Sequence, residues 1–113
     1  MRTTSDYLDH VVAAADKIAE YVAGFDCDSF SADNKTQDAV IRQIEIIGEA
    51  GKYTLESCAT FAADYPDIAR EFQAAKGMRN VLAHGYFGVD VRIVWNTATK
   101  NIPELRDAII GLM

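Results

Sequence analysis

The spacing of apolar residues is the feature that most constrains what this chain can fold into. Apolar residues recur at three- and four-residue steps from about Thr4 to about Ala23, from Asp33 or Asn34 to Ser57, and from Pro66 to near Gly85. This is the period of an α-helix that buries one face. No stretch alternates with a period of two for long enough to indicate a strand. The sequence therefore predicts an all-α fold.

A fourth helix is expected to begin at about Asp90 and to be interrupted at Asn101–Pro103, because proline cannot donate the hydrogen bond of a helix interior. We interpret residues 26–33 as a loop that Phe30 anchors in the core, and residues 56–65 as a link. The 113 residues have the length of a single domain, residues 1–113. Together these features predict an antiparallel four-helix bundle whose last helix is interrupted at Pro103.

The second predicted helix contains two unexpected glycines and a polar stripe. Gly48 and Gly51 each cost about 1 kcal/mol relative to alanine, so they indicate close approach of another helix. The stripe consists of Asp38, Arg42, Glu45 and Glu49. It fits either a solvated face with Asp38–Arg42 and Arg42–Glu45 pairs, or a face turned toward a partner or a site. Ile41 and Ile46 flank the stripe, which suggests a second packing surface such as a subunit interface.

Composition limits the classes of function. The chain is 50% hydrophobic and 25% charged, which indicates a globular protein. Its net charge of -6 argues against a protein that coats nucleic acid with a basic face. Arg42, Lys76, Arg79 and Arg92 are the candidates for a local concentration of positive charge. We expect a cytoplasmic protein without a signal peptide, membrane span or metal site, in which Cys27 and Cys58 are reduced.

Residues 79–86, RNVLAHGY, gather polar groups at the end of the third predicted helix. Arg79 falls where the pattern calls for an apolar residue, and arginine is rarely buried without a partner. Its guanidinium either reaches solvent, pairs with a carboxylate such as Glu49, or lines a crevice that binds phosphate. Asn80 precedes His84 by four residues, which places both on one helix face and the amide within reach of the imidazole.

His84 and Tyr86 each allow a structural and a functional interpretation. A histidine at a helix C-terminus often serves as a cap, but beside Arg79 it can act as an acid or base near neutral pH. Tyr86 can cover the end of the bundle or be a target for modification. Histidine and arginine together suit attack of an RNA 2′-hydroxyl on the adjacent phosphodiester, which needs no metal. A two-fold dimer would double this small set of groups.

The chain resembles the HepT-type toxins of the HEPN superfamily over nearly its whole length. Arg79, His84 and Tyr86 match the RX4HXY signature of these toxins. Further matching segments are Thr36–Val40 (TQDAV), Ile46–Ala50 (IIGEA), Arg79–Asp90 (RNVLAHGYFGVD), Val94–Trp95 and Ile102–Leu105 (IPEL). The arginine–histidine spacing alone is weak, but signature, length and all-α order together are specific.

This resemblance implies a HEPN-like bundle that forms a homodimer, with the two signatures facing each other across a cleft. It implies a metal-independent endoribonuclease that uses no cofactor, with His84 as acid and base, Arg79 binding phosphate and Asn80 in support. It also implies a type VII-like toxin–antitoxin module with an MNT-type nucleotidyltransferase as antitoxin. That partner would inactivate the toxin by transferring AMP to Tyr86, which places a phosphate beside Arg79.

The same residues also fit a second function. The chain can instead be a non-catalytic helical subunit that binds a nucleotidyltransferase and its nucleotide. In that case Arg79 and His84 hold the partner or a nucleotide phosphate. A nuclease loses its activity when His84 is replaced by alanine, whereas a binding subunit cuts no RNA and loses affinity for its partner or nucleotide.

Overall fold

The computed structural model describes the backbone of residues 3–84 and 90–113, and the side chains of residues 3–78 and 90–113. Over these residues the chain forms helices and turns and no strand, which confirms the predicted all-α fold. The long helices are α1 (Thr4–Val22), α3 (Asn34–Ser57) and α5 (Pro66–His84). The last helical stretch consists of α6 (Val91–Asn96), η1 (Thr97–Asn101) and α7 (Ile102–Ile110).

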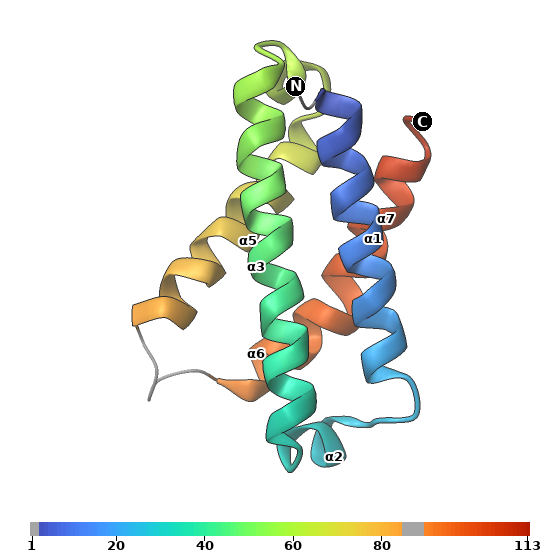
Figure 1. Cartoon of the computed structure of the whole chain (residues 1–113), viewed down its shortest axis with the longest axis vertical. Helices are drawn as coiled ribbons and strands as arrows, with labels where there is room; N and C mark the ends of the chain where they lie inside the picture. Colours follow the sequence, from blue (N-terminus) through green and yellow to red (C-terminus); the bar gives the residue numbers. More distant parts are fainter. Residues whose placement is uncertain (1–2, 85–89) are drawn as a thin grey trace.

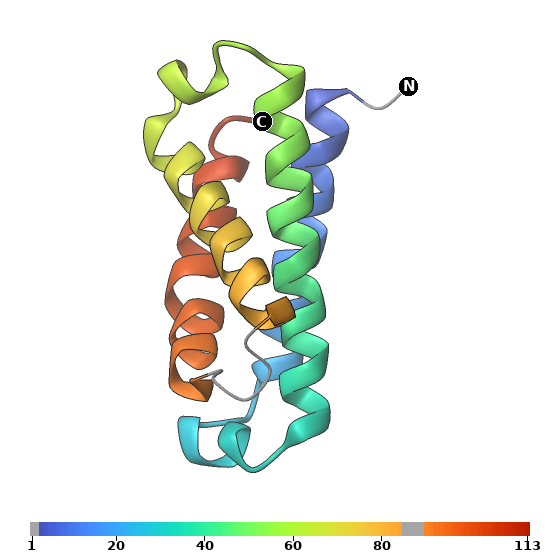
Figure 2. The same cartoon turned by 90° about the vertical axis from the view of Figure 1, so that its left-hand side faces the viewer.

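Successive long helices run in opposite directions. Figure 1 shows α1 descending, α3 rising beside it, α5 descending again and the α6–α7 stretch rising to the C-terminus. Figure 2, from the side, shows α5 inclined to α3 and crossing in front of the last helical stretch. The predicted antiparallel four-helix bundle is confirmed, with the α6–α7 stretch as its fourth member.

The core is built from the apolar faces that the periodicity predicted. The largest fully buried side chains are Phe30, Phe72, Ile18, Ile44, Ile47, Ile109, Val11, Val40 and Thr54. The hydroxyl of Thr54 donates to the carbonyl of Ala50 at 2.9 Å, so this buried polar group is satisfied within its own helix. No helix among the described residues is long and apolar enough to span a bilayer.

The glycines of α3 make the predicted close approach to another helix. A Cβ on Gly48 would lie 3.2 Å from the backbone of Ala75, and a Cβ on Gly51 would lie 2.6 Å from the ring of Phe72. Both neighbours belong to α5, so these two positions set how closely α5 packs on α3. Gly77 differs, because nothing lies within 4 Å of the position of its missing Cβ.

Two segments that the sequence did not predict as helical contain short helices. Residues 26–33 include α2 (Cys27–Ser31), and residues 56–65 include α4 (Phe61–Asp64). In α2, a reciprocal capping box between Asp26 and Ser29 stabilises the first turn. A helix of one turn is too short to show an apolar period, which is why the pattern missed both. Phe30 is buried as predicted, with its ring 5.2 Å from that of Trp95.

The irregularity near Pro103 takes the form of a change in helix type. The chain stays helical through this region, but α6 widens into the π-helical turn η1 before α7 begins at Ile102. Pro103 then sits in the first turn of α7, where its missing N–H costs least. The predicted interruption at Asn101–Pro103 is thus not a break: the irregularity is a π-helical turn at Thr97–Asn101, directly before the turn that contains Pro103.

Candidate functional site

The residues singled out by the sequence lie on the last turns of α5. This helix begins at Pro66 as predicted, and its backbone is helical through His84. Arg79, Asn80 and His84 therefore occupy fixed helical positions. Asn80 and His84 are four residues apart and lie on the same side of α5, with Arg79 one position before Asn80. Tyr86 lies outside the described residues, and its role as the acceptor of AMP stays a prediction.

The first half of α5 is firmly held in the bundle. Ile68, Ala69, Phe72 and Ala75 are buried, as the apolar pattern predicted. The ring of Phe61, in α4, lies 6.0 Å from that of Phe72 and 5.1 Å from that of Tyr65. This aromatic cluster at the start of α5 and the glycine contacts with α3 fix the helix up to about residue 76.

Met78 still packs against the core, and beyond it the end of α5 inclines away from α3. Figure 1 shows its C-terminal end leaning away from α3. Arg79 lies four residues after Ala75, about 6 Å further along the helix axis. The turns that carry Arg79, Asn80 and His84 thus project from a well-packed base, and the packing of α5 on α3 determines where they point.

The polar stripe of α3 is largely solvated. Asp38, Arg42 and Glu49 are exposed, and Glu45 is half-buried. Arg42 pairs with Glu45 at 3.6 Å, which confirms one of the two expected pairs. The expected Asp38–Arg42 pair does not occur among the ion pairs of the described residues. Ile41 and Ile46 are half-buried against the core of the same chain, and their role in a subunit interface remains untested.

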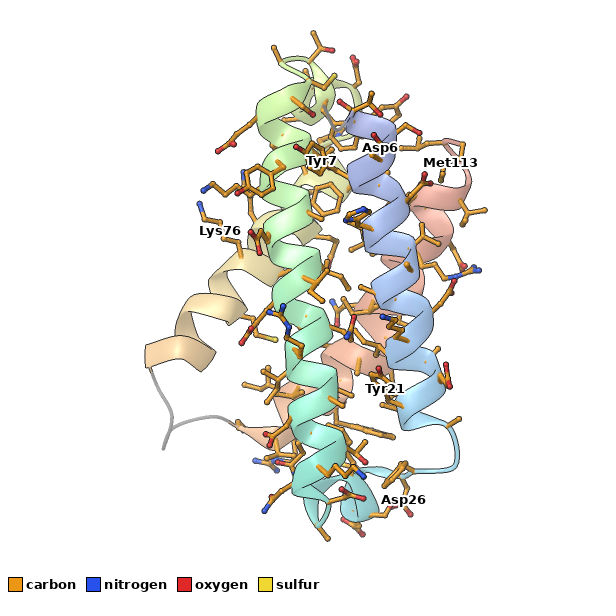
Figure 3. All side chains as sticks on the ribbon, in the orientation of Figure 1. Asp6, Tyr7, Tyr21, Asp26, Lys76 and Met113 are labelled. Atoms are coloured by element: carbon orange, nitrogen blue, oxygen red, sulfur yellow. The ribbon has the colours of Figure 1, made fainter. Side chains whose placement is uncertain are left out.

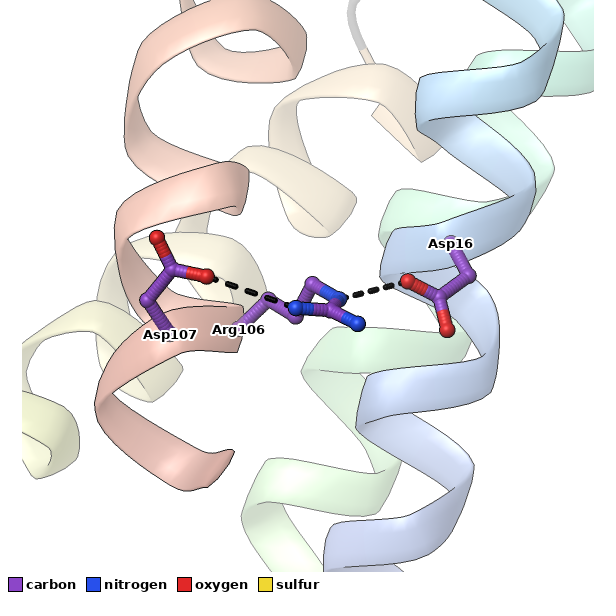
Figure 4. A network of polar contacts seen from close by, with 3 residues as sticks. All are labelled: Asp16, Arg106 and Asp107. Atoms are coloured by element: carbon purple, nitrogen blue, oxygen red, sulfur yellow. Dashed lines mark hydrogen bonds and ion pairs between the residues drawn. The ribbon is translucent and has the colours of Figure 1, made fainter. Parts of the chain in front are cut away.

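Two of the arginines expected to concentrate positive charge lie beside carboxylates. Arg42 pairs with Glu45, and Arg92 lies 3.5 Å from Asp90. Elsewhere Arg106 bridges helices by pairing with Asp16 of α1 at 2.6 Å and with Asp107 at 3.4 Å (Figure 4). The hydrogen bond and charge of Asp16 raise the pKa of Arg106 further above its already high value. Among the arginines and lysines with described side chains, those without a carboxylate within 4 Å are therefore the lysines.

A groove lies between α3 and α5, and its lining on α5 reaches Gly77. It has a volume of about 480 Å³, and its walls include Lys52 and Glu56 of α3 and Gln73 and Lys76 of α5. Lys76 precedes Arg79 by three residues. The sequence singled out Lys76 but missed Lys52, which is 24 residues away in the chain. The signal that could have found Lys52 is its place next to Gly51, the residue that packs on α5.

The family comparison covers most of the chain. The family model described as "Ribonuclease HepT-like" matches residues 12–111. This range contains the whole of α3 and α5 and the last helical stretch, and it includes residues 79–86. No solved structure matches the chain significantly.

Similar curated proteins come from both archaea and bacteria. A protein of Thermococcus cleftensis named "Probable ribonuclease HepT" is 41% identical over 105 residues, covering 93% of this chain and 91% of the relative. A protein of Caldanaerobacter subterraneus whose name proposes an RNase is 36% identical over 105 residues, covering 93% and 89%. A protein of Methanocaldococcus jannaschii whose name joins a gamma-glutamylcyclotransferase to a proposed RNase is 39% identical over 108 residues, covering 95% of this chain and 46% of the relative.

Proposed function

Because this chain belongs to the HepT-like ribonuclease family, we propose that it is a metal-independent endoribonuclease, the toxin of a type VII-like toxin–antitoxin module. One observation carries the proposal. The family match spans residues 12–111, and within it Arg79 and His84 stand at the signature spacing on the projecting turns of α5. RNA is the proposed substrate.

The proposed reaction is transfer of the phosphodiester to the neighbouring 2′-oxygen. The 2′-hydroxyl attacks phosphorus and loses its proton to a base, while the bond to the 5′-oxygen breaks and that oxygen gains a proton. The products are a 2′,3′-cyclic phosphate and a 5′-hydroxyl. His84 moves the protons, and Arg79 stabilises the negative charge on the phosphoryl oxygens. Asn80, four residues before His84, supports the orientation of the imidazole.

A homodimer would double the number of proposed catalytic groups around one phosphate. Each chain offers one arginine and one histidine at the signature positions, and the end of α5 that carries them leans away from α3. Two projecting α5 ends related by a two-fold axis would face each other and place two such pairs around one phosphate. The support for the dimer is therefore the direction in which the end of α5 leans away from α3.

Regulation is proposed to act at Tyr86. The phenol oxygen of Tyr86 would attack the α-phosphate of ATP on an MNT-type nucleotidyltransferase antitoxin, lose its proton and release pyrophosphate. The attached AMP carries a negative phosphate two residues after His84. That phosphate competes for Arg79 with the phosphate of RNA, so the modified protein cannot bind its substrate productively.

A second candidate function is a non-catalytic partner of a nucleotidyltransferase that binds its nucleotide. The observation in its favour is electrostatic. The chain has a net charge of -6, and each arginine with a described side chain pairs with a carboxylate. Such a surface offers few cations to a long RNA, whereas a single nucleotide phosphate requires little more than Arg79.

The deciding experiment is RNA cleavage by the purified protein in excess EDTA. Intact mass first confirms that Tyr86 carries no AMP. We expect the parent to cut RNA and His84→Ala to lose about 10² to 10⁴ of the rate, which is the usual contribution of general acid–base catalysis. His10→Ala is the matched control, since His10 is the other histidine of the chain and is exposed on α1.

The outcomes separate the two functions. Cleavage by the parent and by His10→Ala, with none by a folded His84→Ala, supports the nuclease. Equal cleavage by parent and His84→Ala indicates contamination and removes His84 from the mechanism. No cleavage by an unmodified parent rejects the nuclease and favours the nucleotide-binding subunit, which is then tested by ATP binding in the presence of the nucleotidyltransferase.

A further inference from the structure

The groove between α3 and α5 combines an apolar floor with two lysines. Phe72 forms part of the floor and is 1% exposed, whereas Lys52 and Lys76 are exposed on opposite walls. Figure 3 shows the Lys76 side chain projecting on the outer side of the α3–α5 pair, above the last turns of α5. The two lysines come from different helices, so the close packing at Gly51 is what brings them to one groove.

Both ammonium groups are available to an anion. Neither Lys52 nor Lys76 lies within 4 Å of a carboxylate in the part of the chain with described side chains, although Glu56 lines the same groove. The described arginines, by contrast, all pair with carboxylates. Lys52 Nζ lies 5.7 Å from the centroid of the Tyr53 ring, a weak contact at an exposed position that leaves its charge accessible.

The remaining groove residues include an exposed amide and an open position. Gln73 is exposed on the α5 wall and offers an amide to a base edge or a 2′-hydroxyl. Gly77 has no neighbour within 4 Å of the position of a Cβ, so no described side chain fills the groove at this point. Lys76 and Arg79 are three residues apart, which places them on adjacent turns of one helix.

We propose that this groove binds the phosphodiester backbone of single-stranded RNA and leads it to the turns of α5 that carry Arg79 and His84. The inference rests on the proposed ribonuclease function and names a substrate-binding surface for it. Lys52 and Lys76 each neutralise one phosphate. A net-acidic protein can thereby hold RNA through a short cationic track without a basic face.

The test measures binding of a short, mixed-sequence, single-stranded RNA that carries 2′-O-methyl groups, which prevent cleavage. Fluorescence anisotropy gives the affinity of the full-length protein at several salt concentrations. The groove variant is Lys52→Gln with Lys76→Gln. The matched control is Lys17→Gln with Lys100→Gln, which removes the same charge from exposed lysines of α1 and η1 that do not line the groove.

The groove variant is expected to bind about tenfold more weakly at low salt. The slope of log K against log salt should shrink by about 1.4, since each phosphate contact on a single strand contributes about 0.7. The control should match the parent in RNA affinity and in the slope of log K against log salt. Gly77→Leu provides a second test that alters no charge. It fills the groove at a position with free space, so it should weaken binding while the protein stays folded by circular dichroism.

Equal binding by the groove variant and the parent overturns the proposal, as does equal weakening by both double variants, which would reflect net charge alone. Loss of binding to the nucleotidyltransferase with normal RNA binding would assign the groove to a protein partner and also overturn the proposal.

Cleavage of unmodified RNA by the same samples distinguishes failure of the groove proposal from failure of the ribonuclease proposal. A parent that cuts RNA with an unchanged KM in the groove variant rejects the groove alone, whereas a parent that cuts nothing rejects the ribonuclease.

Discussion

Gly48 of α3 lies directly against Ala75 of α5, so that a Cβ on Gly48 would come within 3.2 Å of both the carbonyl carbon and the carbonyl oxygen of Ala75. A side chain on Gly48 would push the two helix backbones apart by a few tenths of an ångström, so glycine favours this close approach. Arg79 follows Ala75 by one turn. The contact therefore fixes the base from which the candidate site projects, and its loss should disturb the site as well as the fold.

Replacing glycine by alanine should have opposite effects at two positions. Gly51→Ala places a Cβ within 2.8 Å of three atoms of the buried Phe72 side chain and should lower the free energy of unfolding by about 1–3 kcal/mol. Gly77→Ala meets no atom within 4 Å and should raise it by about 0.5–1 kcal/mol through helix propensity. Urea denaturation measures both. A stabilising Gly51→Ala would contradict the close packing of α3 on α5.

These glycines also show how far the sequence alone could lead. Periodicity predicted the long helices, the buried faces and the close approach at Gly48 and Gly51, because those features follow from local spacing. Periodicity could not predict that the missing Cβ of Gly77, which also lies within a helix, would face open space. It also missed α2 and α4, because a one-turn helix is defined by its caps and tertiary contacts rather than by an apolar period.

The candidate site was predictable in part for the same reason. The spacing of Arg79 and His84 is local, and the helical backbone of α5 places both where the sequence put them. The groove depends on two lysines that lie far apart in the chain. Their proximity results from the packing of α3 on α5, which composition and spacing do not reveal. The role of Tyr86 remains a prediction from the signature.

Acid should remove the contribution of the Asp26 charge to stability. The backbone N–H of Ser29 donates to the Asp26 carboxylate at 2.8 Å, and this bond, followed by that of the Ser29 hydroxyl, lowers the pKa of Asp26. A carboxyl whose pKa is lower in the folded state stabilises the fold above its unfolded pKa, near 4, and loses that effect as the pH falls through the folded pKa.

Asp26→Asn keeps an acceptor at the cap but removes the charge. Its Tm should be below that of the parent near neutral pH, and the difference should shrink as the pH falls through the lowered folded-state pKa and the parent carboxyl becomes protonated too. Thermal unfolding followed by circular dichroism measures it. Asp9→Asn, at an exposed position of α1, is the control. A Tm difference for Asp26→Asn that is constant with pH would show that the charge is not what stabilises the cap.

Arg79→Lys should separate the geometry of phosphate binding from its charge. Lysine keeps the positive charge but loses the planar fork that contacts two phosphate oxygens at once. We expect the cleavage rate to fall by about 10², comparable to the loss of one donor to a developing negative charge. Arg70→Lys, on the exposed first turns of the same helix, should cleave at the parental rate. An Arg79→Lys variant with parental activity would limit Arg79 to simple charge neutralisation.

Tyr86→Phe should uncouple RNA cleavage from its inhibition. Removing the phenol oxygen takes away the proposed acceptor of AMP and leaves Arg79 and His84 in place, so the variant should cut RNA at the parental rate. Incubated with an MNT-type nucleotidyltransferase and ATP, the parent should gain the mass of one or more AMP units and lose cleavage, whereas Tyr86→Phe should do neither. Tyr65→Phe is the matched control, because Tyr65 directly precedes α5 and is 39% exposed. This control should be modified and inhibited like the parent.

If Tyr86→Phe still gains AMP, the modification occurs at another residue. If the modified parent still cuts RNA, AMP does not compete for Arg79, and inhibition must act through the partner itself.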